Sequence, residues 1–63
     1  MMQATLTIQM DNAAFEENSV ELARILQDIA DKIEQRGGVV AGDSFVAMDL
    51  NGNRVGELEV KAD

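Results

Sequence analysis

Apolar and polar side chains alternate strictly between residues 4 and 10. In an extended chain Leu6, Ile8 and Met10 point to one face, and two threonines and a glutamine point to the other. A period of two, with β-branched residues on the polar side, is typical of a strand that is buried on one face only. We therefore expect a strand over residues 4–10.

The pattern changes to a helical period after residue 18. The apolar residues that recur at spacings of three and four are Leu22, Ile25, Leu26, Ile29, Ala30 and Ile33. They form one stripe on an α-helix. Asn18 or Ser19 begins this helix, and Asn18 with Glu21 has the spacing of a capping box. Gly37-Gly38 ends it, because glycine readily takes the left-handed conformation that follows a last helical turn.

Ahead of this helix, the pair Asp11-Asn12 ends the first strand. Either side chain can accept hydrogen bonds from the backbone N–H groups of a following turn. We therefore expect a short helical turn over residues 13–17.

A β-hairpin is predicted over the last third of the chain. Residues 44–50 are rich in apolar side chains and are the expected second strand, and Asn51-Gly52 follows them. Asn-Gly is a strong hairpin signal, because both residues tolerate the positive φ that tight turns require. A third strand then extends to about residue 61. Two registers remain open: a two-residue loop pairs Asp49 with Arg54, and a three-residue loop with a G1 bulge pairs Asp49 with Asn53.

The register decides which apolar side chains share a face of the hairpin. With the two-residue loop, one face carries Phe45, Leu58 and Val60, and the other carries Val46, Met48 and Val55. Val55 and Leu58 share a face only if Gly56 marks a bulge. One helix cannot cover both faces. An apolar patch left over would be a dimer seam or a partner site.

These elements predict a single α+β domain over residues 1–63 with the order β-α-β-β. One amphipathic helix packs on a three-stranded, mostly antiparallel sheet. Placing the first strand beside the third makes every pairing antiparallel. A right-handed crossover with the first two strands parallel and adjacent is the alternative.

Composition narrows the classes of function. The chain has 63 residues, no cysteine, no histidine and a net charge of −7. A domain this small has a thin core and usually needs disulfides, a metal or a partner to stabilise it. Without cysteine or histidine, either self-association as a homodimer or idealised packing remains, and the homodimer is slightly favoured. With only five basic residues, direct nucleic-acid binding is not expected. No stretch predicts a signal peptide or a membrane span, so we expect a soluble, cytoplasmic protein.

The sequence also argues against catalysis. Serine and threonine are present as nucleophiles, but no histidine is available to activate them. Asp49-x-Asn51-x-Asn53 starts like a calcium-binding loop. It then has Arg54 where a glycine is required and Val60 where a bidentate glutamate is required. We expect no enzyme activity, no cofactor and no bound metal.

Acidic residues dominate the expected helix and the segment before it. Such a surface could imitate the phosphates of a nucleic acid and occupy a basic groove on another protein. The candidate partner-binding residues are Glu16, Glu17, Glu21, Asp28, Asp31, Glu34 and, as a hydrophobic anchor, Phe15.

Three stretches together resemble short uncharacterised proteins of proteobacterial phages, prophages and plasmids. These are Asp11-Asn12-Ala13-Ala14-Phe15-Glu16, then Glu21-Leu22-Ala23-Arg24-Ile25-Leu26 with Asp28-Ile29-Ala30-Asp31, and Asp49-Leu50-Asn51-Gly52-Asn53-Arg54-Val55-Gly56. The resemblance covers most of residues 5–60 and implies an origin in a mobile element, where very small proteins often modulate host machinery. The expected function is a protein-binding module that inhibits or modulates a host protein, for example an anti-defence or anti-CRISPR factor. The alternative is a homodimeric structural or accessory phage protein with no host target.

Overall fold

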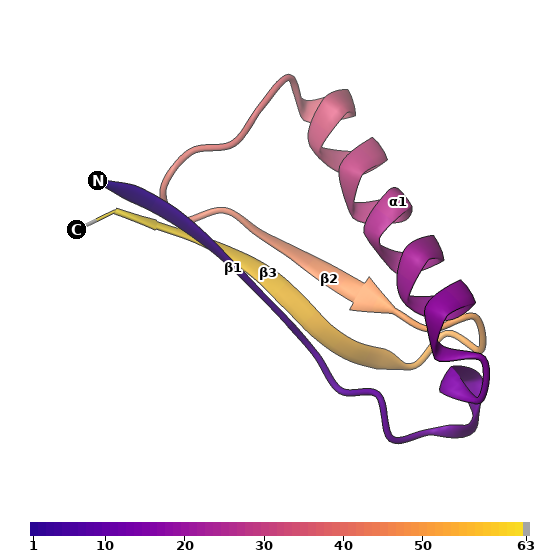
Figure 1. Ribbon diagram of the computed structural model, residues 1–63. Coiled ribbons are helices and arrows are strands. Elements are labelled where there is room, and N and C mark those ends of the chain that lie inside the picture. Colours follow the sequence, from indigo (N-terminus) through magenta and orange to yellow (C-terminus); the bar gives the residue numbers. More distant parts are fainter. Residues whose placement is uncertain (63) are drawn as a thin grey trace.

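The computed structural model describes residues 1–62, apart from the side chains of Asn18 and Ser19. The elements in chain order are β1 (Met2–Ile8), a 3-10 turn η1 (Ala13–Phe15), α1 (Asn18–Arg36), β2 (Ser44–Met48) and β3 (Arg54–Ala62). Figure 1 shows α1 over one face of the sheet. The strand order is β1-β3-β2 and both pairings are antiparallel. The predicted α+β fold is therefore confirmed, and the parallel alternative is wrong.

β1 lies two residues closer to the N-terminus than the alternation predicts. It pairs with β3 in an unbroken register from Met2 opposite Ala62 to Ile8 opposite Gly56. Gln9 still donates its N–H to the carbonyl oxygen of Val55, at 2.7 Å. The chain then leaves the sheet, so the predicted end of the strand at residue 10 is wrong.

The segment between β1 and α1 contains the predicted helical turn, shortened to three residues. Asn12 caps it, because its side-chain oxygen accepts the N–H of Ala14 at 2.9 Å. The turn brings Phe15 into the core, where only 5% of its surface is exposed.

α1 begins at Asn18, one of the two predicted starts, and ends where the glycines indicate. Gly37 takes φ +82° and donates its N–H to the carbonyl oxygen of Glu34. The capping box is wrong, because the N-cap position is Glu17, without a side-chain cap, and Glu21 has other partners. The side chain of Asn18, which the box also requires, lies outside what the structure describes.

The hairpin takes the three-residue loop. Asp49 donates its N–H to the carbonyl oxygen of Asn53 at 2.9 Å, and Gly52, at φ +85°, donates to the carbonyl oxygen of Asp49 at 3.0 Å. The register then shifts between Ala47 and Met48, which leaves Val55 as an extra residue on β3. This bulge lies next to Gly56, where one is needed for Val55 and Leu58 to share a face of the sheet. It turns Val55 into the core.

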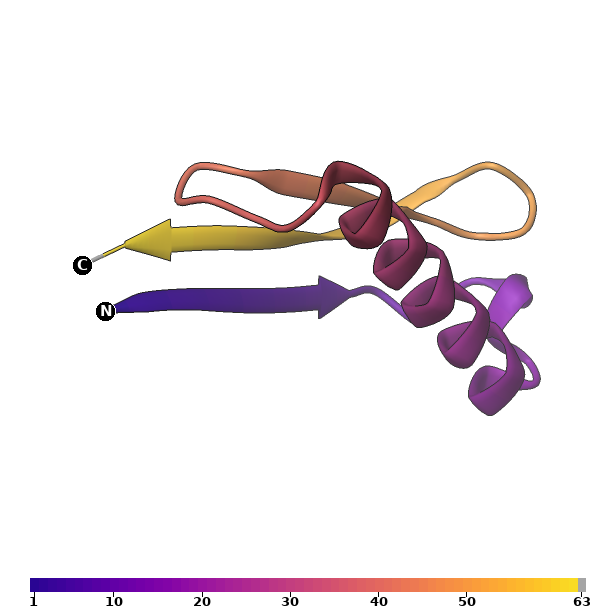
Figure 2. The same ribbon diagram turned by 90° about the horizontal axis from the view of Figure 1, so that it is seen from above.

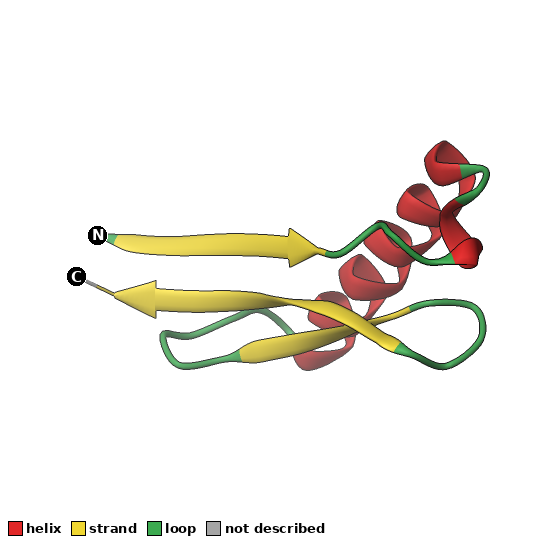
Figure 3. Cartoon of the chain, turned by 90° about the horizontal axis from the view of Figure 1, so that it is seen from below, coloured by secondary structure: helices red, strands yellow, loops and turns green. Residues whose placement is uncertain are grey.

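The core lies between α1 and the face of the sheet that carries Phe45 and Ala47. Its buried members are Phe15, Ile25, Ile29, Phe45, Ala47 and Val55. Figure 2 shows α1 crossing the sheet at an angle, so that the N-terminal half of β1 and the C-terminal half of β3 extend beyond it. Figure 3 shows the opposite face of the sheet, with the helix behind the strands.

Candidate functional site

The polar interior is concentrated at one end of the molecule, where the β2–β3 loop meets η1 and the start of α1 (Figure 1). We call this the loop end and define it as residues 11–21 together with residues 48–53. Two buried carboxylates, Asp49 and Glu21, connect its parts.

Asp49 holds the loop in its conformation. Only 4% of its surface is exposed. One carboxylate oxygen accepts the backbone N–H groups of Asn51 and Asn53, at 2.9 and 2.8 Å. The other accepts the side-chain amides of Asn12 and Asn53, at 2.9 and 3.2 Å. Burial works to raise the pKa of Asp49, but these four hydrogen bonds outweigh it and hold the pKa below its usual value.

Glu21 joins the first turn of α1 to the same loop. Its carboxylate accepts Arg24 Nε at 2.7 Å and the backbone N–H of Leu50 at 2.8 Å. Arg24 also donates through Nη2 to the carbonyl oxygen of Met48, at 2.8 Å. The hydrogen bond from Arg24 lowers the pKa of Glu21 most, and it prevails over the opposing effect of burial. Helix and hairpin are therefore fixed to one another by a charge-assisted network.

Two of the predicted partner-binding residues lie in the interior. Glu21 is 3% exposed and Phe15 is 5% exposed, so neither can contact a partner from where it lies. This corrects the prediction: Phe15 belongs to the core, and Glu21 is a structural carboxylate. Asp28 is half-buried, with its carboxylate 3.1 Å from Lys32 Nζ.

The other predicted residues, Glu16, Glu17, Asp31 and Glu34, are exposed. The structure does not bring them together on one surface. Glu16 and Glu17 lie at the loop end, whereas Asp31 and Glu34 lie on the C-terminal half of α1. At a rise of about 1.5 Å per residue, Glu17 and Asp31 are roughly 20 Å apart along the helix axis.

All five basic residues are occupied in ion pairs within the chain. The pairs are Arg24–Glu21, Lys32–Asp28, Arg36–Asp43, Arg54–Glu57 and Lys61–Glu59. Among residues 1–62, the exposed carboxylates that form no ion pair are therefore Asp11, Glu16, Glu17, Asp31 and Glu34. Three of these five lie at the loop end.

Exposed apolar side chains accompany them there. Val20 and Leu50 are 63% and 65% exposed. Val20 lies in the first turn of α1, where its N–H donates to the carbonyl oxygen of Glu17 at 3.0 Å, and Glu16 lies in the segment directly before this turn. Leu50 is held beside this turn by its hydrogen bond to Glu21. Neither residue was among those predicted from the sequence to bind a partner. Two signals were available: Val20 lies off the apolar stripe, and Leu50 directly precedes the Asn-Gly turn.

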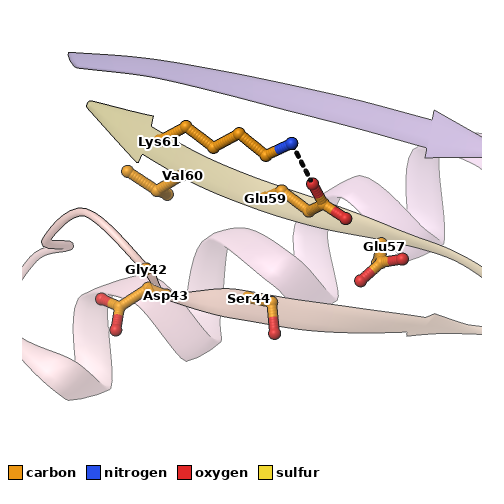
Figure 4. A pocket seen from close by; sticks show the side chains of 7 residues that line it. All are labelled: Gly42, Asp43, Ser44, Glu57, Glu59, Val60 and Lys61. Atoms are coloured by element: carbon orange, nitrogen blue, oxygen red, sulfur yellow. Dashed lines mark ion pairs between the residues drawn. The ribbon is translucent and has the colours of Figure 1, made fainter. Parts of the chain in front are cut away.

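The open face of the sheet is mostly polar, and of the apolar patch considered from the sequence it keeps Val46 and Met48 but not Val55, which lies in the core. A shallow hollow of about 250 Å³ lies there (Figure 4). Its lining is formed by Gly42, Asp43, Ser44, Glu57, Glu59, Val60 and Lys61. Lys61 Nζ lies 3.2 Å from Glu59 within it. Phe45, Leu58 and the bulged Val55 pack toward α1. Val46 and Met48 alternate with the buried Phe45 and Ala47 along β2, so these two apolar side chains remain on the open face.

No protein-family model, curated protein or solved structure matches the chain. Within residues 1–62, the helices are too short or too polar to cross a membrane.

Proposed function

We propose that this chain is a non-catalytic protein-binding module that engages a basic surface of another protein through its loop end. The observation that supports this is the separation of charge. Each of the five arginine and lysine side chains is paired with a carboxylate, whereas Glu16 and Glu17, which form no ion pair, lie at the same end of the molecule as exposed Val20 and Leu50. Apolar anchors ringed by charge are the usual composition of a binding site whose centre supplies affinity and whose rim steers association.

The network beneath the loop supports the same proposal. Asp49 and Glu21 fix the backbone on both sides of Leu50. A side chain on a pre-ordered loop loses little conformational freedom on binding, so more of its contact energy appears as affinity.

The chemistry of the partner follows from the charge. A basic groove flanking an apolar pocket fits Glu16 and Glu17 around Leu50, and such grooves occur on proteins that handle nucleic acids. The resemblance to phage, prophage and plasmid proteins favours a host protein of the bacterial cytoplasm as the target, inhibited by occupation of that groove. A defence effector such as a CRISPR nuclease belongs to this class.

The test is affinity capture from a proteobacterial lysate with matched variants. The wild-type chain should retain a dominant basic partner at low salt and release it at high salt, because salt screens exposed charges. Leu50→Ser should weaken binding of the purified partner by roughly five-fold or more, the loss of about 1 kcal/mol that defines a contributing interface residue.

The charge variants locate the surface. Glu16→Gln with Glu17→Gln removes two charges from the loop end, and Asp31→Asn with Glu34→Gln removes two from the far part of α1. Loss of capture in the first pair alone supports the loop end. Loss in the second pair alone moves the site to the helix face expected from the sequence, and equal capture by all variants refutes the proposal.

A further inference from the structure

β1 is an outer strand of the sheet, and its second edge meets no other strand within residues 1–62 (Figure 3). Protein edge strands are normally protected from pairing by charged side chains, proline, bulges or shortness. β1 has none of these: it is seven residues long, carries no charged residue or proline, and pairs with β3 without a register shift. The opposite edge strand, β2, has five residues and lies against the bulge.

The pairing with β3 shows which backbone groups of β1 remain free. Gln9 donates its N–H toward β3. In an antiparallel ladder, successive residues direct their backbone groups to opposite sides. The odd-numbered residues of β1 therefore bond to β3. The N–H and C=O groups that point to the open edge belong to Met2, Ala4, Leu6 and Ile8.

The side chains of these same residues lie on the helix side of the sheet, in line with Ile8, which packs on the core. α1 does not cover the N-terminal half of β1 (Figure 2). Met2 is 54% exposed and Leu6 is 37% exposed as a result. A strand added at this edge would both satisfy the free backbone groups and cover part of this apolar surface.

We propose that the added strand is β1 of a second copy of this chain, paired antiparallel about a two-fold axis at Thr5. This is the register in which all seven residues of β1 find a partner. It places Met2 opposite Ile8 of the second copy and Ala4 opposite Leu6 of the second copy. Apolar residues then meet on the helix side, and polar residues meet on the open side. The result is a six-stranded antiparallel sheet with both helices on one face.

Charge also favours a second copy at this edge. Two chains of net charge −7 repel over most of their surfaces, but β1 brings no charged side chain to the seam. On the adjacent strand, Glu59 would face Glu59 of the second copy across three strand spacings, about 14 Å, and Glu57 would face Lys61 of the second copy. That distance exceeds the Debye length of about 8 Å at physiological ionic strength.

The single chain exposes more surface and is more extended than a compact monomer of its size. Its accessible surface is 4372 Å², whereas a globular monomer of this mass exposes about 4,000 Å². Its radius of gyration is 12.3 Å, against about 10.6 Å for a compact domain of this length. The excess of about 400 Å² is about half of the roughly 800 Å² per partner that a standard interface buries.

The experiment is sedimentation equilibrium over a concentration series on the wild type and two proline variants. Ala4→Pro removes an N–H that points to the open edge and keeps the ladder to β3, so it should lower dimer affinity at least ten-fold with an unchanged circular dichroism spectrum. Ser44→Pro is the matched control. By the same alternation it removes an outward N–H, but on β2, and it should dimerise like the wild type.

A second variant covers the case in which Ala4→Pro fails to fold. Thr5→Lys places two like charges opposite each other at the two-fold axis, while in the monomer the lysine faces Glu59. It should be a folded monomer, and mixing it with Thr5→Glu should restore a dimer.

Amide hydrogen exchange gives an independent measurement. Protection of the Ala4 and Leu6 amides should rise with protein concentration, while protection of Thr5 and Thr7 stays constant. A wild-type chain that remains monomeric into the millimolar range overturns the proposal. So does a Thr5→Lys or folded Ala4→Pro variant that dimerises like the wild type. Neither result bears on the loop end, which uses other residues.

Discussion

Gly56 and Thr7 lie backbone to backbone across β3 and β1, so close that a β-carbon at position 56 would overlap the carbonyl oxygen of Thr7. The obstacle is main chain of a paired strand, which cannot rotate away as a side chain could. Gly56 also adjoins the bulge at Val55, where β3 changes its pairing with β2. A glycine at this position therefore permits the close approach of three strands at one point.

Replacing Gly56 with alanine should be among the most destabilising single substitutions in the chain. The overlap forces β1 and β3 apart, and we expect a loss of more than about 3 kcal/mol in the free energy of unfolding. A domain of this length has roughly 3–9 kcal/mol in total, so much of the variant should be unfolded at room temperature. Urea denaturation followed by circular dichroism measures this.

Gly52→Ala is the comparison that separates overlap from backbone strain. Gly52 has φ +85° but open space around its α-carbon, so alanine there meets only the cost of the left-handed conformation, about 1–2 kcal/mol. A Gly56→Ala variant no less stable than Gly52→Ala would contradict the structural account of Gly56.

The strand order could be narrowed only to two alternatives, because it depends on pairing between segments that are distant in sequence. The elements themselves could be predicted from the sequence because they depend on local periodicity. Alternation, the apolar stripe and the glycines at Gly37 and Gly52 each carry their own signal. The hairpin register could not be predicted, because Asn51-Gly52 fits both loops. The observed loop is held by the Asp49 carboxylate, which accepts the N–H groups of Asn51 and Asn53 within the hairpin and the side-chain amide of Asn12, 37 residues away in sequence. A contact between residues this far apart in sequence cannot be recognised from the pattern of apolar and polar positions.

The candidate site was predicted less well, for a related reason. Glu21 was grouped with the exposed acidic residues by its charge, although it precedes the fully buried Ile25 by four residues and therefore shares its side of the helix. Its burial is compensated by Arg24 and by the N–H of Leu50. A charged residue on the apolar side of a helix thus indicates a buried network of hydrogen bonds. Glu21 is such a residue, and its network lies at the loop end.

Stability should fall in acid because the pKa values of both Asp49 and Glu21 are lowered by folding. A carboxyl group with a lowered pKa contributes stability above its unfolded value, about 3.9 for Asp and 4.3 for Glu, and this contribution is lost as the pH falls through the folded value. We expect constant stability from neutral pH to about pH 5, and a steep decline below about pH 4.

Asp49→Asn tests the share of one group in this decline. The variant should be less stable at neutral pH, and its difference between neutral and acid pH should be smaller than that of the wild type, because an amide does not protonate. Asn53→Ala keeps the carboxylate and removes one hydrogen-bond donor. Its change in stability between neutral and acid pH should therefore lie between those of Asp49→Asn and the wild type. Equal pH dependence in Asp49→Asn and the wild type would show that Asp49 is not held in this network.

Neighbouring residues on α1 should differ sharply in their sensitivity to truncation. Ile25 is the largest side chain that is fully buried among the described residues, and Ile25→Ala should cost about 2–5 kcal/mol. Leu26 is 43% exposed, and Leu26→Ala should cost less than about 1 kcal/mol. Urea denaturation of the two variants compares the same kind of truncation on one helix. Similar losses would show that α1 is rotated about its axis from the orientation described above.

Salt should act in opposite directions on the two proposed interactions. Binding of a basic partner at the loop end depends on attraction to Glu16 and Glu17, so its affinity should fall as the Debye length shortens from about 10 Å at 0.1 M to about 3 Å at 1 M. Self-association through β1 opposes the repulsion of two chains of net charge −7, so its affinity should rise over the same range. Sedimentation and partner titration in the same buffers measure both. A dimer that dissociates with rising salt would place acidic side chains against basic ones at its seam, which the uncharged β1 cannot provide.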